Sequence, residues 1–259
     1  MKLIILAAGT GSRLSPLTDS MPKVMVPVSG RSILDWQIQV ARSVGIQEII
    51  VVRGHMSHQI NRPGLQYIDN ENYLHSNMVA TLWCALDYFD EGFIVSYGDI
   101  LYQPEVLESL LTGGDEIGVI VDKDWKPYWE RRFEDVLDDA ESFKVAKDGF
   151  ITEIGQRTQN IEEIQGQYIG LTVFRANGVK YLVDSLESMF EKPFFSDSST
   201  IKKFDDLYMT DVLQCLITLG HPVKEVPVSG GWVEVDSIKD YEIANEIVEN
   251  NDGILRINR

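Results

Sequence analysis

The sequence contains few cysteines and few histidines, and this limits the structural classes that it can belong to. Its two cysteines, Cys84 and Cys215, lie far apart and form no C-x-x-C pair. Its four histidines show no zinc-ligand spacing with cysteine. A disulfide framework and a cysteine-ligated zinc site are therefore not indicated. We expect two buried thiols in a reducing compartment.

Long apolar runs and an excess of positive charge are also missing. No stretch approaches the length of a membrane span, and the sequence opens with a core-like strand rather than a signal peptide. We therefore expect a cytoplasmic protein with no membrane partner. The 23 Lys and Arg residues face 40 Asp and Glu residues, a net charge of -17. This balance argues against a nucleic-acid partner, which needs a basic face, and means that a polyanionic ligand must be met by local cations.

The most informative pattern lies in the first 23 residues. An apolar run over residues 3–8 leads into a loop with Gly9 and Gly11, followed by Arg13 and, ten residues later, by Lys23. Glycine has no Cβ, so the backbone of such a loop can bend and approach a ligand closely. Successive N–H groups in a turn of this kind form a concavity that binds anions. With two cations nearby, the pattern predicts a phosphate-binding site.

Two common phosphate-binding motifs do not fit this loop. A dinucleotide fingerprint needs a third glycine where Leu14 stands, and an acidic ribose ligand where the second predicted strand runs into Arg53-Gly54. A P-loop needs G-K-[ST], which Gly11-Ser12-Arg13 does not supply. An ordinary turn between a strand and a helix is the remaining alternative.

Apolar runs alternate with helical patterns through the first half of the chain. This rhythm predicts an α/β fold with a doubly wound, mostly parallel, Rossmann-like sheet. The expected strands are the opening run, Glu48–Val52, Leu65–Ile68, Phe93–Tyr97 and Ile117–Val121. One expected helix follows Ser32 as its cap, a second opens at Asn77 and includes Leu86, and a third runs from Pro104 through Leu111.

The pattern changes after Asp122. Two short strands flank Lys147-Asp148-Gly149, which predicts a small inserted hairpin. The further expected elements are strand Tyr168–Phe174, helix Asn177–Phe190, a polar mobile loop over Ser196–Lys203, helix Thr210–Leu219, strands Val223–Pro227 and Trp232–Val235, helix Ser237–Glu249 and a fraying tail after Asn250. Without a repeat or a linker, we expect a single domain over residues 1–259.

Two acidic residues stand at the ends of predicted strands. Asp99 follows Tyr97-Gly98 at the end of a central strand, where open parallel sheets place their ligand sites. Asp236 follows another strand and directly precedes a helix. Taken singly, the first fits a turn and the second fits a helix N-cap equally well. Taken together, two carboxylates can hold Mg²⁺, which prefers oxygen ligands and shares its coordination with substrate phosphates.

The N-terminal run resembles the signature of the sugar-phosphate nucleotidyltransferase superfamily, L-A-A-G-x-G-[ST]-R-[LM]-x-P-L-T followed by P-K. The match extends from Leu6 through Thr18 to Pro22-Lys23. The resemblance implies a GT-A-like fold and a loop that wraps a nucleoside triphosphate. Arg13 would contact the β- and γ-phosphates and Lys23 the reacting α-phosphate. Asp99 and Asp236 match the two metal-binding aspartates of that superfamily, with Mg²⁺ as the cofactor.

Within this superfamily the chain is more similar to the small phosphocholine and phosphonate cytidylyltransferases than to the hexose-1-phosphate enzymes. It shares Glu71-Asn72-Tyr73 and Asn77, the run from Asp206 to Asp211, and Glu234 to Ser237. This resemblance places Ser76 and Asn77 beside a cytosine. The nucleotide-binding residues that it implies are Leu6, Ala7, Ala8, Gly9, Thr10, Gly11, Ser12, Arg13, Lys23, Ser76, Asn77, Tyr97 and Gly98.

The same resemblance implies an acceptor pocket formed by Trp129, Asp206, Tyr208 and Glu234, which could enclose a cationic amine. Residues 1–122 would then be the nucleotide-binding half, and residues 123–259 the half with the acceptor pocket and second metal ligand. We expect the aromatic segment Trp125–Trp129 on a loop, with at least one ring packed over the sheet. We expect Arg131-Arg132 on a solvated face.

The sequence as a whole predicts a Mg²⁺-dependent cytidylyltransferase. It would transfer CMP from CTP to a small phosphorylated or phosphonate acceptor and release pyrophosphate, with Arg13 and Lys23 as catalytic residues. Surface-polysaccharide modification or phosphonate assembly would be a natural pathway. One alternative is a sugar-1-phosphate nucleotidyltransferase that uses another nucleotide. A second is a non-catalytic nucleotide-sensing subunit, which would typically have lost one of the four charged residues.

Overall fold

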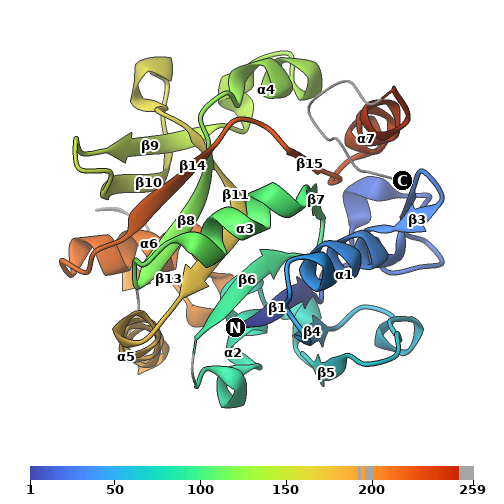
Figure 1. Cartoon of the computed structure of the whole chain (residues 1–259), viewed down its shortest axis with the longest axis horizontal. Helices are drawn as coiled ribbons and strands as arrows, with labels where there is room; N and C mark the ends of the chain where they lie inside the picture. The colour runs from blue at the N-terminus through green and yellow to red at the C-terminus, as the bar shows by residue number, and fades with distance from the viewer. Residues whose placement is uncertain (91, 192–193, 196–200, 251–259) are drawn as a thin grey trace.

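The computed structural model describes residues 1–90, 92–191, 194–195 and 201–250, which are arranged around a seven-stranded sheet (Figure 1). The strand order is β14-β8-β11-β6-β1-β4-β5. Neighbouring strands are parallel except for β11, which is antiparallel to both β6 and β8. The bounds are β1 Lys2–Ala7, β4 Glu48–Arg53, β5 Gln66–Asp69, β6 Phe93–Tyr97, β8 Ile117–Asp122, β11 Gln167–Phe174 and β14 Lys224–Val228. The prediction of a mostly parallel α/β sheet is confirmed.

Helices cover both faces of this sheet because its strands are apolar on both sides. In β1, Leu3 and Ile5 belong to one hydrophobic core and Ile4 and Leu6 to the other. The first core includes residues of α1 (Ile33–Ser43), α3 (Pro104–Thr112), α4 (Lys126–Arg132) and α7 (Ile238–Asn250), and the second includes residues of α2 (Met78–Trp83), α5 (Asn177–Glu191) and α6 (Met209–Thr218). This is the doubly wound arrangement that the alternating pattern predicts.

Smaller strand pairs add to the central sheet. The predicted hairpin is present as β9 (Glu141–Val145) and β10 (Ile151–Arg157). The pair that matters most for the site is β7 (Ile100–Tyr102) with β15 (Trp232–Glu234), since it places the chain after Glu234 beside Asp99. The backbone N–H of Val235 donates to the carbonyl of Asp99 at 2.8 Å. The remaining pairs are β2 (Pro27–Val28) with β3 (Arg31–Ser32) and β12 (Phe194–Phe195) with β13 (Ile201–Lys202).

Most expected elements lie within one or two residues of their predicted bounds, and Ser32 caps α1 by accepting from the N–H of Asp35. Two expectations about secondary structure are wrong. The helix from Asn77 ends at Trp83, and Leu86 lies in a separate 3₁₀ turn. The aromatic segment is not a loop, because residues 126–132 form α4 with Pro127 in its first turn, where its missing N–H costs nothing.

The expectation of two buried thiols is also wrong. Cys84 is exposed just beyond the end of α2, and Cys215 in α6 is half-buried. Of the loop expected over residues 196–203, residues 196–200 lie outside the described residues and Ile201–Lys202 form β13. The tail after Asn250 also lies outside them. The division of the chain near residue 122 stays a prediction. Among the described helices, none combines the length and the apolar character that a membrane span requires.

Candidate active site

The loop after β1 is folded tightly against the chain around Lys23. Gly11 has a φ of 65°, and a Cβ at this position would lie 2.9 Å from the Cβ of Lys23. The carbonyl of Gly11 accepts from the Leu14 N–H at 2.9 Å and from the Thr18 hydroxyl at 2.8 Å. Glycine suits position 11 for two reasons. Other residues rarely adopt a φ of 65°, and a Cβ would lie too close to Lys23.

A cavity of about 270 Å³ opens at this loop, at the carboxyl ends of β1 and β6. A Cβ at Gly98, on its wall, would lie 2.5 Å from the carbonyl oxygen of Leu6, so the close approach of the two strands depends on this glycine. The structure brings together here every residue predicted to bind the nucleotide, together with both predicted metal ligands. The lining residues that the sequence analysis missed are Val24, Tyr73, Met78 and Thr81.

Four charged side chains meet at one end of this first cavity. The Lys23 ammonium lies 2.7 Å from Asp99 Oδ2 and 2.5 Å from Asp236 Oδ1. The Arg13 guanidinium lies 2.5 Å from Asp236 Oδ2 and is 71% exposed. Burial opposes the charge of Lys23, but the two carboxylates more than offset it and raise its pKa to about 12. The two acids therefore converge on a single point, although they are 137 residues apart in the sequence.

The carboxylate pair is suited to a hard cation. Asp99 Oδ1 is buried and has no hydrogen-bond partner among the described residues, so it has a lone pair available for one. The described ranges contain no cluster of three or more acidic, histidine or cysteine side chains placed to bind a metal. A cation here would have only these two protein ligands, as expected where the phosphates of a substrate complete the coordination.

Another part of the cavity wall is held by a hydrogen-bond network. The Asn77 side chain caps α2 by accepting from the Met78 N–H at 3.0 Å. The buried Asn70 amide donates to the hydroxyls of Ser76 and Thr81, each at 3.0 Å. This network fixes the segment before α2, so Ser76 and Asn77 lie in fixed positions at the cavity wall.

A second cavity of about 220 Å³ adjoins the first and shares Tyr97 and Met78 with it. Trp129, Tyr208 and Glu234 line it as predicted for the acceptor pocket. Asp206 does not, and lies instead on a neighbouring hollow with Lys202 and Tyr208. The lining residues that the sequence analysis did not name include Asp139, Glu141, Ser142, Gly155, Gln167, Tyr168 and Thr210.

The second cavity is acidic. Asp139, Glu141 and Glu234 line it, and no Lys or Arg among the described residues does. Burial, reinforced by the neighbouring carboxylates of Asp139 and Asp211, raises the pKa of Glu141 to about 7. Burial also raises the pKa of Asp139, and that of Glu234 despite the nearby guanidinium of Arg132. A positively charged ligand would reduce the repulsion between these carboxylates and stabilise their charged forms.

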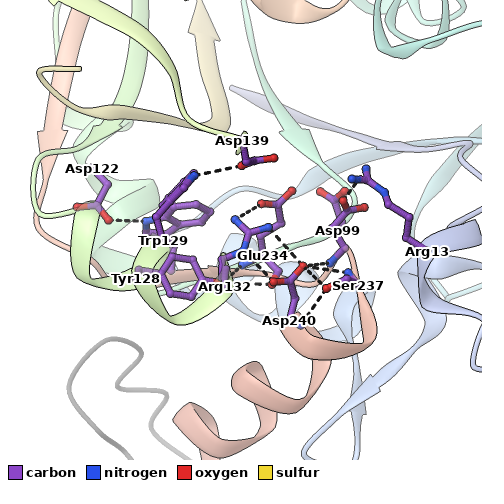
Figure 2. Close-up of polar contacts among 12 residues, drawn as sticks. Arg13, Asp99, Asp122, Tyr128, Trp129, Arg132, Asp139, Glu234, Ser237 and Asp240 are labelled. Atoms are coloured by element: carbon purple, nitrogen blue, oxygen red, sulfur yellow. Dashed lines mark hydrogen bonds and ion pairs between the residues drawn. The ribbon is translucent and has the colours of Figure 1, made fainter. Parts of the chain in front are cut away.

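Trp129 reaches the second cavity from α4 but offers little surface, since it is 3% exposed. Its indole N–H donates to Asp139 Oδ2 at 3.1 Å, as Figure 2 shows. Its ring packs against Trp125, Tyr128 and Trp232 with centroid distances of 5.7 to 5.9 Å. All three aromatic residues of the segment at positions 125–129 are buried, where at least one was expected to be.

Arg132 is the clearest error of the sequence analysis in this region. It was expected on a solvated face together with Arg131, but it is buried and paired with Glu234 and Asp240. Trp129 and Arg132 are three residues apart on α4 and so share a face of the helix. Helical spacing within residues 126–132 therefore indicates that Arg132 lies on the buried side of α4 together with Trp129.

Comparison with known proteins supplies a family-level match. Residues 3–147 match the family model of the MobA-like NTP transferase domain. The chain is 36% identical over 257 residues to the CTP:phosphoglutamine cytidylyltransferase of Campylobacter jejuni, covering 95% of this chain and 100% of that protein.

Two solved structures have a similar fold. A CTP:phosphocholine cytidylyltransferase from Streptococcus pneumoniae aligns with a TM-score of 0.70 at 20% identity, over 95% of this chain and 98% of that one. The inositol-1-phosphate CTP transferase from T. maritima aligns with a TM-score of 0.70 at 24% identity, over 96% of each chain. These likenesses support the nucleotidyltransferase fold predicted from the sequence.

Proposed function

The chain belongs to the family of MobA-like NTP transferase domains, and from this premise we propose that it transfers CMP from CTP to a small phosphorylated acceptor. The observation that carries the proposal is the charged group at the end of the first cavity. Arg13 and Lys23 lie beside a glycine loop suited to phosphates, and two carboxylates converge on the same point. The name of the 36%-identical relative supports CTP as the nucleotide.

The reaction follows from the chemistry of these groups. A phosphate oxygen of the acceptor attacks the α-phosphorus of CTP in line, and the bond from that phosphorus to the bridging oxygen breaks, so that pyrophosphate leaves. Such a displacement depends on positioning and charge stabilisation. Arg13 and Lys23 offset the charge that gathers on the α-phosphate and the leaving group. The nucleophile is already an anion, so no side chain has to remove a proton.

We include a divalent cation in the proposal. Asp99 and Asp236 would hold Mg²⁺, and the buried, unpartnered Oδ1 of Asp99 supports this assignment. When bound, the ion would neutralise charge on the reacting phosphates. The Lys23 ammonium donates to both carboxylates, so its charge lies at the point where the proposed cation and the reacting phosphates would meet.

The second cavity is the proposed acceptor site. The two cavities adjoin at Tyr97 and Met78, so a phosphate of an acceptor bound in the second cavity would lie near the α-phosphorus of a nucleotide bound in the first. Its three carboxylates favour an acceptor with a positively charged amino group, such as a phosphorylated amine or amino acid. The relative that acts on phosphoglutamine supports an acceptor of the amino-acid type.

The test is a matrix of nucleotides and acceptors with pyrophosphate release as the readout. CTP, UTP, ATP and GTP are each combined with phosphoglutamine, phosphocholine, 2-aminoethylphosphonate and a hexose 1-phosphate. We expect turnover with CTP and at least one acceptor that carries an amino group. Turnover confined to the hexose 1-phosphate would favour a sugar-1-phosphate enzyme instead, and binding of nucleotide without turnover would favour a sensing subunit.

A further inference from the structure

One buried guanidinium lines neither cavity but contacts a residue that lines the second. Arg132 ends α4, and its side chain is 2% exposed. Its Nη1 is 2.6 Å from Glu234 Oε2, and its Nε is 2.8 Å from Asp240 Oδ1 (Figure 2). A single cation is thus shared by two carboxylates that belong to different elements.

Glu234 is fixed by α4 through both its backbone and its side chain. The Tyr128 hydroxyl accepts from the Glu234 N–H at 3.0 Å and donates to the Glu234 carbonyl at 3.2 Å. Arg132 holds the carboxylate of the same residue in an ion pair. This contact is close but is not aligned as a hydrogen bond, and Nη1 has no hydrogen-bond partner among the described residues. The carboxylate that lines the second cavity is therefore held by charge.

Asp240 connects the same guanidinium to the first cavity. Its Oδ2 accepts from the Ser237 N–H and hydroxyl at 2.9 Å each and from the Asp236 N–H at 3.3 Å. The Asp240 N–H donates in return to the Ser237 hydroxyl at 3.2 Å, which completes a capping box at the start of α7. This turn places the Asp236 side chain beside Lys23 and Arg13. Arg132 therefore supports Asp236 indirectly, through its ion pair with Asp240.

Arginine suits this place better than lysine. Burial opposes the charge of Arg132, but the carboxylates of Glu234 and Asp240 more than offset it and raise its pKa further. The planar guanidinium reaches both carboxylates at once from separate nitrogens, whereas one ammonium group has no such fork. The rings of Tyr128 and Trp129 pack near it, with centroids 5.4 and 5.2 Å from its Cζ.

We propose that Arg132 is a positioning residue. It aligns Glu234, a carboxylate of the proposed acceptor site, with Asp236, a carboxylate of the charged group in the first cavity. It acts on the first directly and on the second through Asp240. The inference rests on the proposed function, because the roles of Glu234 and Asp236 belong to it. Acceptor binding and the transfer step would then both depend on the position of the Arg132 side chain.

The test is Arg132→Lys, which keeps the charge and removes the fork. We expect the KM for the acceptor to rise about 30-fold or more and kcat to fall about tenfold, with the KM for CTP within threefold of the original value. A purely structural role would lower the amount of active enzyme and leave the acceptor KM unchanged. The matched control is Arg131→Lys on the same helix, since Arg131 pairs at the surface with Glu246 and should change neither constant.

Amide hydrogen exchange gives a readout that needs no acceptor. In Arg132→Lys the N–H groups of Glu234, Asp236 and Ser237 should exchange about tenfold faster or more, while those of β1 and β6 keep their rates. If the native chain turns over no acceptor, the proposed function fails, and the exchange rates still decide the role of Arg132. Unchanged exchange at these three amides, or an unchanged acceptor KM in an active enzyme, would overturn the inference.

Two further variants cover the case in which Arg132→Lys does not fold. Glu234→Gln leaves the pair of Arg132 with Asp240 intact and should raise the acceptor KM with little change in kcat. Asp240→Asn leaves the pair with Glu234 intact and should lower kcat with little change in the acceptor KM. Equal effects of the two variants on both constants would contradict a support that acts separately on each side.

Discussion

The two cavities are built in different ways. The first includes one contiguous stretch, residues 6–13, which runs from the end of β1 through the glycine loop, and its two cations match its two carboxylates. The second is lined by residues of many separate elements, among them α4, α6, β9, β10, β11 and β15, and it carries three carboxylates without a lining cation among the described residues. A backbone cradle recognises what all triphosphates share, whereas a wall of side chains can select one acceptor. Variants in the two regions should therefore fail in different ways.

The largest effect is expected at the charged group of the first cavity. Lys23→Ala and Asp99→Asn should each lower turnover about 10³-fold with every acceptor, because Lys23 acts on the reacting phosphates and Asp99 would hold the cation that neutralises them. Pyrophosphate release measures this, and thermal unfolding checks that the fold is kept. The control is Lys126→Ala, on an exposed side chain that pairs only loosely with Glu130 at 3.9 Å. Turnover within tenfold of the original in either variant would break the assignment.

The dependence of the first cavity on backbone geometry can be tested at Gly98. In Gly98→Ala the new Cβ would lie 2.5 Å from the Leu6 carbonyl oxygen, so the two strand ends must move apart. We expect CTP affinity to fall about 100-fold or more, and stability to fall by about 1–3 kcal/mol, as for other overpacked sites. Calorimetric titration with CTP measures the first and denaturant unfolding the second. Gly114→Ala is the matched control, since nothing lies within 4 Å of a Cβ there.

The second cavity should respond to the loss of a carboxylate through the acceptor alone. Glu141→Gln should raise the KM for an amino-bearing acceptor about tenfold and leave the KM for CTP unchanged. The reason is that the acceptor's amino group loses its ion pair with the buried Glu141 carboxylate. Steady-state kinetics with each substrate varied in turn separates the two constants. A change in the KM for CTP as large as that for the acceptor would mean that the two cavities are not separate in function.

The last expected effect is a pH-dependent gain in stability in the same variant. The pKa of Glu141 is raised from 4.5 to about 7, so the folded state holds a proton that the unfolded chain releases. Stability due to this group is therefore present below about pH 4.5 and is lost as the pH rises through about 7. Glu141→Gln should be more stable than the native chain by about 1–3 kcal/mol at pH 8 and by nothing at pH 4.

Unfolding in denaturant at the two pH values checks this expectation. The groups that face Glu141 are the carboxylates of Asp139 and Asp211 and the cations Lys202 and Arg157, and all of them remain in the variant. A stability difference that is equal at both pH values would show that Glu141 is not held protonated by its surroundings.

The sheet and the residues of the first cavity could be predicted from the sequence because both follow local rules. An apolar run followed by a glycine loop specifies a strand and a turn within 14 residues. Asp99 could be placed at the site because ligand sites of open parallel sheets lie at the carboxyl ends of the strands, and Asp236 because the family resemblance implies it as the second metal ligand. The pairing of β7 with β15, which brings them together, could not be read from either segment alone.

The second cavity could be predicted only in part, because it depends on packing between elements far apart in the sequence. Arg132 looks like a surface residue beside Arg131, and only the contacts with Glu234 and Asp240 make its burial favourable. Asp139 and Glu141 carry no motif and become lining residues through the position of β9. Asp206 was taken from a motif whose spacing matches, yet its side chain lies in a neighbouring hollow.

The pairing of Lys23 with two aspartates also bears on how a triphosphate reaches a protein with a net charge of -17. At long range the molecule repels such an anion, and attraction begins only within a Debye length of the loop, about 10 Å at moderate ionic strength. Because Arg13 is mostly exposed and Lys23 is not, the arginine meets an incoming triphosphate first. Added monovalent salt weakens the long-range repulsion, so capture of the nucleotide should quicken with ionic strength until the local attraction is screened as well.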